Sequence, residues 1–418
     1  VIQNLLKGGT TTVYRQQMNL NATIPLNKIP IFDFTTLTYR FSGTYTWNRM
    51  PFAIPDSESI GNTIQNTNGH NINANFNLVQ LYNKIPYFKK LNSPPPPKPA
   101  KNMAKNQKGK ATLGLKMDVE PEDTTKKANN FKEIGEFLAR GIMMIKNVSL
   151  TFQQQGGQGM PNFKPSSKYG GMDPGAGMAP GFLFTTGLAD SKIREKSVAN
   201  DWLVKNRNQT TPYTEMFSRN YSYQTQIEPH GSFKVQLTGS YNKSENTTEY
   251  IIFDSVNNTF NLRNSPSVTG NFDISTFTFF RSFKDGNDQM QSKLFSEFLL
   301  ARPNVARELG AKNPASAGEL KDNNGSAYID GYTTNQQDVL MQAFYRTYTG
   351  RSIKGYNTRN IFPTVPLPNW TVSWDGLGKL DFFKKTFRTI TVRHGYKSNY
   401  RVSSFSNNIL FKEIEFPE

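Results

Sequence analysis

The stretch from Ile361 to Val402, IFPTVPLPNWTVSWDGLGKLDFFKKTFRTITVRHGYKSNYRV, contains two runs of alternating residues around a turn-rich connector. In the first run, Trp370 to Trp374, both tryptophans and the valine between them fall on one face. A period of two is typical of a β-strand with an apolar medium on one side and water on the other. Asp375 and the glycine after it break the run, as turn residues do. The stretch therefore predicts a β-hairpin.

The second run, from Arg388 to Val402, keeps the same alternation over a longer distance. Its more apolar face carries Ile390, Val392, His394, Tyr396, Tyr400 and Val402. Its polar face carries Thr389, Thr391, Arg393, Lys397, Asn399 and Arg401. We therefore expect this run to form the returning strand of the hairpin.

The composition favours an all-β chain. Of the 418 residues, 13% are aromatic and 36% are hydrophobic, whereas a soluble globular chain is usually nearer half apolar. Tyr, Phe, Thr, Asn and Gly are frequent, and the many aromatic residues argue against a fully disordered chain. Because there is no Cys, the sequence excludes a disulfide scaffold and thiolate metal sites.

The formal net charge of +17 leaves two interpretations open, a solvated basic surface or attraction to anionic lipid headgroups or nucleic acid. No nucleic-acid-binding module is recognisable, so we expect no nucleic-acid partner. No run of about 18 apolar residues exists, so the sequence predicts no helical membrane anchor.

The clearest alternation of the chain lies between Thr36 and Arg49, where Tyr39, Phe41 and Tyr45 share one face and Arg40 lies on the other. This run is longer than the roughly 9–11 residues with which a strand crosses a bilayer. Taken alone, it fits a strand of a soluble sandwich better than a membrane strand, because the signal from a single segment is weak.

Further strands are expected where the alternation returns in the rest of the chain. In one of them Val235 and Leu237 share a face and Lys234 lies on the other. The polar residues 242–246 then predict a hairpin turn, and a change of phase near Ser275 predicts a β-bulge. The expected strands are Phe76–Tyr82, Val148–Phe152, Tyr213–Gln226, Phe233–Asn242 and Thr247–Phe253.

Loops and helices divide the chain into regions. Pro94–Pro97 and the lysines after them indicate an extended basic loop, and Phe131–Ile145 has the spacing of a short amphipathic helix. The glycine-rich stretch 153–181 is expected to be a flexible loop, and Phe295–Leu309 is expected to form a helix pair or a helix broken at Pro303. The predicted regions are 1–92 (strands), 93–130 (basic loop), 131–147 (helix), 148–294 (strands with the glycine-rich loop), 295–333 (helical and loop insert) and 334–418 (strands).

No group of residues in the sequence predicts catalysis. The three histidines, His70, His230 and His394, lie in different segments, and none has a partner at metal-ligand spacing. Carboxylates such as Glu215 and Asp375 could be paired for glycoside hydrolysis, but any β-rich chain offers such pairs. We therefore expect a protein that is not an enzyme, with no catalytic residue, no cofactor and no metal site.

Several strings of residues, taken in order, resemble one family. They are similar to the C-terminal part of the SprA/Sov family, the giant outer-membrane translocon proteins of the Bacteroidetes type 9 secretion system. The most specific strings are P-L-P-N-W (366–370), W-D-G-L-G-K-L (374–380), F-F-K-K (382–385) and H-G-Y-K-S-N-Y (394–400). Weaker ones are G-N-T-I-Q-N (61–66), L-Y-N-K-I-P-Y (81–87), K-N-V-S-L-T-F (146–152) and M-A-P-G-F-L-F (178–184). The matching motif residues are Pro366, Pro368, Asn369, Trp370, Gly376, Leu377, His394, Gly395 and Tyr396.

The resemblance implies an all-β fold, a section of a very large antiparallel transmembrane β-barrel with long loops and a few short helices. The whole protein would be much longer than this chain and would lie in the bacterial outer membrane. It would export folded cargo proteins in type 9 secretion, by passive conduction that partner proteins gate. The implied partners are an outer-membrane shuttle barrel (PorV-like), a periplasmic plug protein, other type 9 secretion components, the cargo proteins, and membrane lipids with lipopolysaccharide.

This hypothesis assigns roles to the two faces of the strands. The lipid-facing or packed face is expected to carry Tyr39, Phe41, Tyr45, Val235, Leu237, Ile390 and Val392. The lumen-facing or water-facing side is expected to carry Arg40, Lys234 and Arg393. Two other functions stay open from the sequence, a nutrient-uptake outer-membrane transporter barrel and a soluble surface protein that binds carbohydrate. The first would need a plug domain, and the second should fold without detergent.

Overall fold

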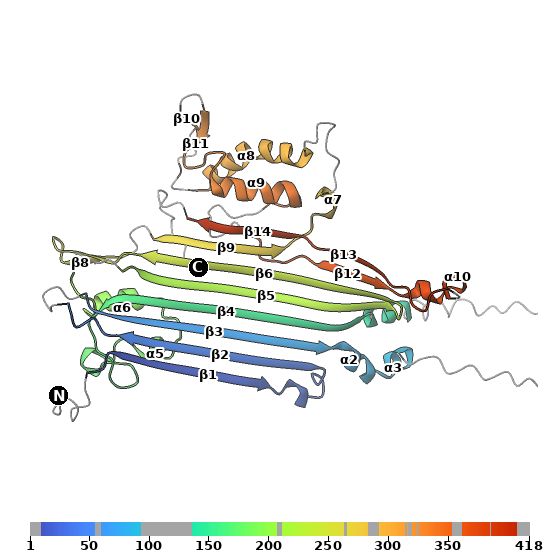
Figure 1. Ribbon diagram of the computed structural model, residues 1–418, viewed down its shortest axis with the longest axis horizontal. Helices are drawn as coiled ribbons and strands as arrows, with labels where there is room; N and C mark the ends of the chain where they lie inside the picture. Colours follow the sequence, from blue (N-terminus) through green and yellow to red (C-terminus); the bar gives the residue numbers. More distant parts are fainter. Residues whose placement is uncertain are drawn as a thin grey trace, which may run out of the picture.

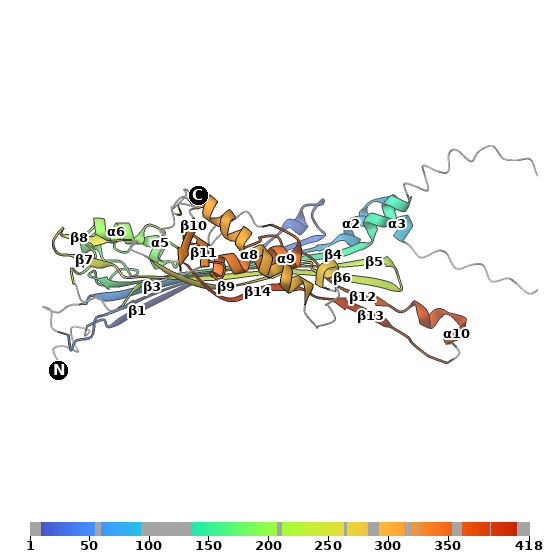
Figure 2. The ribbon, with the colours of Figure 1, turned by 90° about the horizontal axis from the view of Figure 1, so that it is seen from above.

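A computed structural model describes residues 10–54, 60–92, 136–206, 211–262, 266–282, 292–313, 316, 320–323, 326–352, 362–384 and 386–407. Most of these residues form one large antiparallel sheet, with helices gathered at its ends and beside one edge (Figure 1). Seen from above, the sheet is a single thin layer of long strands (Figure 2).

The first six strands of the sheet lie side by side in chain order, and each is antiparallel to the one before it. They are β1 (Val13–Ile24), β2 (Thr35–Asn48), β3 (Asn62–Asn77), β4 (Ile145–Phe163), β5 (Tyr213–His230) and β6 (Phe233–Glu249). Strands β2 to β5 have a partner along both edges, so the ladder satisfies their backbone groups even where the sequence is rich in Asn, Ser and Gly.

The outer edge of β6 is shared by two strands that lie end to end. Strand β9 (Ser267–Ser275) pairs with one half of β6, and β12 (Asn369–Trp374) pairs with the other half in the same direction. The outermost strand position of the sheet is also shared by two strands. There β13 (Val392–Tyr396) pairs with β12, and β14 (Asn399–Ser406) pairs with β9. We call the place where both outer strands are interrupted, residues 275–276, 367–369 and 397–398, the seam.

A helical module is inserted between β9 and β12 and lies beside β14 (Figure 1). It consists of α7 (Phe279–Ser282), α8 (Lys293–Lys312), the small strands β10 (Leu320–Asn323) and β11 (Ser326–Ile329), and α9 (Gln337–Thr349). Val305, Leu309 and Val339 form its own core between α8 and α9. Tyr345 of α9 packs against Tyr400 of β14, which fixes the module to the sheet.

At one end of the strands, a long connection between β4 and β5 folds over one face of the sheet (Figure 1). We call its residues 164–206 the covering loop. It contains η3 (Pro174–Ala176), α5 (Phe182–Thr185) and α6 (Ile193–Ala199). The small hairpin of β7 (Ile252–Asp254) and β8 (Thr259–Asn261) adds Phe260 to the same core.

The opposite end of the strands carries short helices in three connections. The β1–β2 connection holds η1 (Leu26–Lys28), and the β3–β4 connection holds α2 (Leu78–Lys84), α3 (Pro86–Asn92) and a helix over 136–143. The β12–β13 connection holds η4 (Gly376–Lys379) and α10 (Asp381–Lys384). By contrast, only Gly231 and Ser232 join β5 to β6.

The prediction of a mainly β chain with a large antiparallel sheet is confirmed. So is the predicted hairpin, since Trp370 of β12 lies opposite Tyr396 of β13. The second run differs from its prediction at both ends, however. Its last residues, Asn399 to Val402, belong to β14 and pair with β9 instead of β12, and Ile390 precedes the strand. The amide N–H of Phe387 still bonds to the carbonyl of Phe383 in a helical turn, so extended structure begins only at Val392.

The prediction of a glycine-rich loop over 153–181 is wrong for its first part, because β4 continues to Phe163. The glycines are there to let neighbouring strands pack closely. A Cβ on Gly159 would lie 2.6 Å from Oγ1 of Thr214, and one on Gly156 would lie 3.2 Å from Oδ1 of Asn68. Glycine at these positions signals close approach within a sheet rather than a loop.

Two predicted features near the strand ends are also wrong. The predicted strand Phe76–Tyr82 ends at Asn77, whose side chain accepts a hydrogen bond from the amide of Gln80 at 3.3 Å and caps α2. The predicted turn at 242–246 does not exist, because β6 runs straight through it. Asn242 lies opposite Asn220 on one side and Asp273 on the other, and pairing on both edges overrides the turn preference of these residues.

The region 276–349 differs from its prediction in three ways. The phase change after Ser275 marks the end of β9 and not a β-bulge. Helix α8 continues through Pro303, which is exposed. The proline lacks the N–H of one helical hydrogen bond, and buried residues on both sides of it hold the helix in place. Residues 337–349, expected among the C-terminal strands, form α9, which Gly350 ends at φ +70°.

The predicted basic loop 93–130 lies outside the described residues. Of the predicted helix 131–147, residues 136–143 are helical and residues 145–147 already belong to β4, while 131–135 lie outside the described part.

Candidate functional site

The sheet has two chemically different faces, and the strand register fixes which residues lie on each. Across the sheet, Tyr39 lies on the same face as Ile72, Phe152 and Tyr221, because these residues are opposite one another in successive strands. We call this the apolar face and the other side the polar face. The structure places Tyr39, Phe41, Tyr45, Val235, Leu237 and Val392 on the apolar face. It places Arg40, Lys234 and Arg393 on the polar face.

The part of the apolar face on the side of the strand ends that carry α2 and α10 exposes large side chains, and we call this part the apolar band. The chain that enters β12 crosses the band at β5, where the hydroxyls of Tyr221 and Tyr223 donate to the carbonyls of Thr364 and Pro366. The large side chains exposed in it are Leu20, Ile24, Ile72, Leu150, Trp374 and Val392. Leu150, in the middle of the sheet, is 43% exposed, whereas Tyr45 on the same face is fully buried under the covering loop.

Charged and amide side chains bound the apolar band toward the covering loop. Arg219, Lys243 and Gln154 lie in one row across the strands on the apolar face. Arg219 donates a hydrogen bond to Gln154 at 3.2 Å, and Lys243 pairs with Glu245 at 2.9 Å. The apolar band therefore ends at a polar row and does not merge with the covered core.

The polar face is uncharged over the three central strands. On this face, β3, β4 and β5 carry only Asn, Gln, Ser, Thr and Gly, apart from Met216. The positions concerned are every second residue of Gln65–Asn75, Asn147–Gly159 and Thr214–Gln226. An open groove of about 670 Å³ crosses this face, with Thr67 among the residues that line it. This surface can donate and accept hydrogen bonds but carries no fixed charge.

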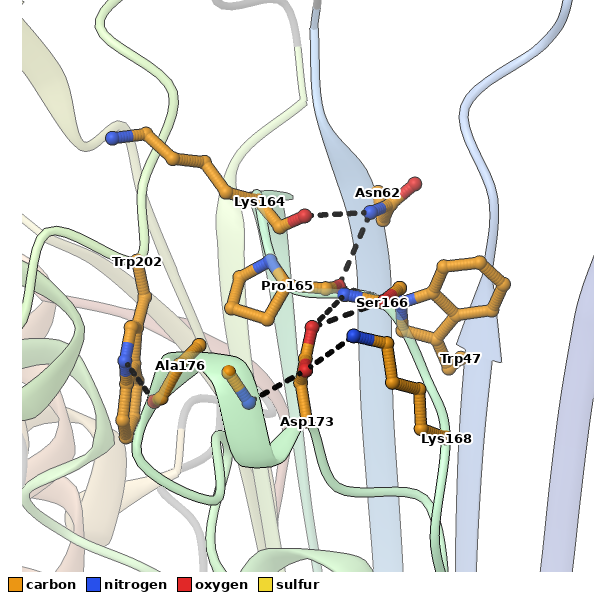
Figure 3. A network of polar contacts seen from close by, with 10 residues as sticks. Trp47, Asn62, Lys164, Pro165, Ser166, Lys168, Asp173, Ala176 and Trp202 are labelled. Atoms are coloured by element: carbon orange, nitrogen blue, oxygen red, sulfur yellow. Dashed lines mark hydrogen bonds and ion pairs between the residues drawn. The ribbon is translucent and has the colours of Figure 1, made fainter.

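The covering loop is fixed to the sheet by side chains where β2 ends and β3 begins (Figure 3). The indole N–H of Trp47 donates to the carbonyl of Pro165 at 3.0 Å, and the amide of Asn62 donates to the same carbonyl at 3.2 Å. Farther along the loop, the indole N–H of Trp202 donates to the carbonyl of Ala176 at 3.0 Å. These bonds satisfy loop carbonyls that burial removes from water.

Asp173 organises the first turn of the covering loop (Figure 3). Its carboxylate accepts hydrogen bonds from the hydroxyl and amide of Ser166 at 3.0 and 3.1 Å, from the ammonium of Lys168 at 2.9 Å and from the amide of Gly175 at 3.0 Å. Burial raises the pKa of the Asp173 carboxyl, but these donors outweigh burial, so its pKa lies below the ordinary value.

A buried ion pair holds α6 of the covering loop against β5 and β6. The guanidinium of Arg194 lies 2.7 Å from the carboxylate of Glu249, whose side chain is completely buried. The same guanidinium stacks over the ring of Tyr213, 4.9 Å from its centroid. Removing one partner of such a pair leaves an uncompensated buried charge, so the pair fixes the position of the loop.

The seam gathers the P-L-P-N-W residues. The amide of Leu367 donates to the carbonyl of Ser275 at 2.9 Å, and the hydroxyl of Ser275 donates back to the carbonyl of Leu367 at 2.7 Å. The side chain of buried Asn369 accepts from the amide of Ser398 at 2.9 Å. Asn369 therefore joins the two interrupted strand positions across the seam.

The remaining motif residues are divided between the seam and the strand end. Trp370 stacks on Tyr396 with ring centroids 4.3 Å apart, and the hydroxyl of Tyr396 accepts a bond from the amide of Thr278 beyond the seam. Pro366 and Pro368 flank Leu367 in the chain as it enters β12. Gly376 and Leu377 form η4 at the end of the hairpin, and His394 and Gly395 are exposed on β13.

The histidines are not brought together, since His70, His230 and His394 lie on three different strands, β3, β5 and β13. The described residues contain no group of three or more His, Asp or Glu that could hold a metal ion together. Within the same ranges, every helix is too short or too polar to span a bilayer.

Sequence reasoning missed the residues that fix the covering loop and the seam. Asp173 is followed by proline and glycine, a turn signal that marks a structured loop and could have identified it. Ser275 has no comparable signal, because its role depends on a residue 92 positions away. Comparison with protein-family models and with curated proteins finds no match to this chain.

Proposed function

We propose that this chain is a section of the wall of a very large outer-membrane β-barrel, the protein-conducting channel of the type 9 secretion system. In this proposal the apolar band faces lipid and the polar face lines a water-filled lumen. Folded cargo proteins pass through the lumen, and partner proteins open and close it. The chain performs no bond-making chemistry.

The observation that carries the proposal is the exposed apolar band. Its exposed side chains lie on β1, β3, β4, β12 and β13, from Leu20 to Val392. Soluble monomers rarely expose a contiguous apolar patch larger than a few hundred Å². A membrane strand, by contrast, alternates lipid-facing apolar residues with polar residues on the lumen side. The alternation of Leu150 with Ser149 and Thr151 on β4 follows this rule.

The lengths of the strands also support a membrane wall. Strands β3 to β6 have 16, 19, 18 and 17 residues, more than the roughly 9–11 that cross a bilayer. The extra length holds the covering loop, beyond the polar row of Arg219 and Lys243 that ends the apolar band. Charged residues are costly at the bilayer midplane and cost little near its interfaces, which is where this row would lie.

The chemistry of the polar face suits conduction of proteins. Asn, Gln, Ser and Thr keep the surface wet, so a passing protein exchanges hydrogen bonds with water rather than burying apolar area. Because the central strands carry no charge on this face, neither acidic nor basic cargo proteins would be held there by strong electrostatic attraction.

The partners and the location of the protein belong to the same proposal. The resemblance to the SprA/Sov family supports an outer-membrane location, an outer-membrane shuttle barrel of the PorV type, a periplasmic plug protein and the other type 9 secretion components. A lumen wide enough for a folded protein needs such a plug, because an open pore of that size would let other large solutes cross the membrane.

The experiment that tests the proposal is fractionation of the native protein from its source cells, with its mass determined intact. We expect a species several times heavier than 47.3 kDa in the outer membrane, co-purifying with a second barrel. A soluble monomer of 47.3 kDa would overturn the proposal and favour a surface carbohydrate-binding protein. An outer-membrane protein that takes up a small nutrient without secretion partners would favour a transporter barrel instead.

A further inference from the structure

Three segments meet at the strand ends next to the apolar band. They are the β1–β2 connection (25–34), helices α2 and α3 (78–92), and the helix over 136–143. The ammonium of Lys84 bonds to the carbonyl of Pro30 and pairs with Asp33, and the hydroxyl of Tyr82 donates to the carbonyl of Ile142 at 2.8 Å. These contacts join the segments into one unit, which we call the end cluster.

The end cluster turns large apolar side chains outward. The helix over 136–143 packs through Ala139 and Met143, which are buried, while Phe137 is 74% exposed on its other side. The β1–β2 connection does the same with Ile31, which is 70% exposed. The exposed apolar residues of the cluster include Ile31, Phe32, Ile85, Tyr87, Phe137 and Leu138. Every one of the three segments contributes to this surface.

Basic side chains stand among these apolar residues. Lys28, Lys90 and Arg140 are exposed and form no ion pair with another described residue. Two basic residues of the covering loop that serve for comparison are paired, Lys164 with Asp201 and Lys196 with Asp190, both at 2.6 Å. The end cluster thus presents positive charge that the described part of the chain does not neutralise.

Exposed apolar side chains and exposed basic side chains also occur together on the other side of the sheet at this end of the strands. Around α10, Phe382 is 83% exposed and Phe387 is 51% exposed, with Lys384 and Arg388 beside them in sequence and also exposed. Figure 1 shows α2, α3 and α10 at the same end of the strands. The exposed apolar and basic residues therefore border the apolar band from β1 to β13.

We propose that the end cluster lies in the headgroup layer of the membrane and binds anionic phospholipids. Its apolar side chains enter the boundary between headgroups and acyl chains, by about 5–10 Å as interfacial helices do. Its cations meet lipid phosphates, to which basic residues near a membrane surface are attracted. This inference rests on the proposed function, because it needs the adjoining apolar band to face the acyl chains.

The experiment measures the depth of single labelled cysteines in the whole protein, reconstituted in discs of phosphatidylethanolamine with phosphatidylglycerol. The 418 residues contain no cysteine, and any cysteine elsewhere in the protein is first changed to serine. A nitroxide is attached at Leu138→Cys in the end cluster, Leu150→Cys in the apolar band or Gln155→Cys on the polar face. Collisions with oxygen and with a water-soluble nickel chelate then report the depth of each label.

We expect the label at 138 to lie at headgroup depth, the label at 150 deep in the acyl region, and the label at 155 in water. A water-exposed label at 138 with a deep label at 150 would overturn this inference and leave the proposed function standing. A water-exposed label at 150 would overturn the proposed function, whatever the depth at 138. A label at 138 that is protected only when a secretion partner is added would assign the end cluster to protein docking and overturn the inference as well.

The contribution of charge is tested with the label kept at 138. Changing Lys90→Gln together with Arg140→Gln should move this label toward water in discs that contain phosphatidylglycerol. The same change should have little effect in discs of phosphatidylethanolamine alone. The matched control is Lys164→Gln with Lys196→Gln at the other end of the strands, which should move the label in neither lipid. An equal response in both lipids would refute the recognition of anionic headgroups.

Discussion

At the scale of single residues, the covering loop is positioned by glycines that allow close contact. Gly171 has φ +86°, and a Cβ there would lie 2.7 Å from the ring of Tyr45. Gly187 has φ +85°, and its Cβ would lie 2.5 Å from the Cα of Gly43 on β2. The loop therefore lies directly on the strands, with no space for a side chain at these points.

Changing Gly171→Ala should lower the free energy of opening of the covering loop by about 2–4 kcal/mol, because it adds a clash to the cost of a positive φ. Gly177→Ala is the matched control. Gly177 has φ +66° but no atom within 4 Å of the added Cβ, so it should cost only about 1–2 kcal/mol. Amide exchange of the loop measures both values. Equal costs would contradict the close contact with Tyr45.

Acid should loosen the first turn of the covering loop through Asp173. The pKa of this carboxyl is lower in the folded state than the ~3.9 of an unfolded aspartate, so its stabilising effect is complete above that pH. The effect is lost as pH falls through the lower, folded-state pKa. Protection of the amides of Ser166 and Gly175 from exchange should follow this loss.

Asp173→Asn should expose the same two amides already at neutral pH and remove the acid dependence. The control is Asp201→Asn. The side chain of Asp201 is 65% exposed and pairs with Lys164 across the surface, so this change should have little effect. An unchanged acid response in Asp173→Asn would mean that another carboxyl is responsible.

At the scale of elements, the sequence predicts a strand well where the alternation has strong contrast between apolar and polar residues. β2 and the β12–β13 hairpin have large aromatic residues on one face, so the period of two is easily seen. It predicts poorly where neighbouring strands decide the structure. The polar run 242–246 stays extended only because β5 and β9 pair with it on both sides, and such long-range pairing cannot be read from local residues.

The same limit applies to the candidate site. Alternation predicted which of Tyr39, Arg40, Val235 and Lys234 share a face, because side-chain direction is a local property of a strand. It could not predict that the covering loop buries Tyr45 while Leu150 on the same face stays exposed. That difference depends on where a distant connection folds back.

Asn369 should be essential for holding the interrupted strands together at the seam. Changing Asn369→Ala leaves the amide of Ser398 without its acceptor in a buried position and should destabilise the junction locally by about 1–3 kcal/mol. Increased amide exchange at residues 275–276 and 398–399 would show the effect. Lys397→Ala, at an exposed position of the seam whose side chain bonds to no other described residue, should have a much smaller one. Equal protection in the two variants would show that the backbone pairing alone holds the seam.

Pro303 should be a site where helix α8 can be stabilised. Pro303→Ala restores a backbone N–H and removes the clash of the ring with the preceding turn, so we expect a gain of up to about 3 kcal/mol in the stability of the helix. Amide exchange in α8 measures the gain. Slower exchange only at the first turn, with no change near position 303, would contradict this explanation.

At the scale of the whole molecule, the two faces of the sheet should respond oppositely to a new charge. Leu150 and Thr151 are adjacent on β4 and lie on the apolar and polar faces respectively. In the proposed barrel, Leu150→Lys should impair assembly into the membrane by about 2–4 kcal/mol, whereas Thr151→Lys should be tolerated. The amount of folded protein recovered from the outer membrane measures both. Equal recovery would mean that the apolar band does not contact lipid.

The seam has a further consequence, which concerns the ancestry of the protein. β9 and β12 run in the same direction along β6, and the chain leaves the sheet at Ser275 and returns at Leu367, to which Ser275 is hydrogen-bonded. An insertion into a single ancestral strand would leave this trace, because both halves keep their register after the new segment is added. Related sheets without the helical module should therefore have one uninterrupted strand here. The seam would then also be the place where evolution can exchange one module for another without altering the sheet.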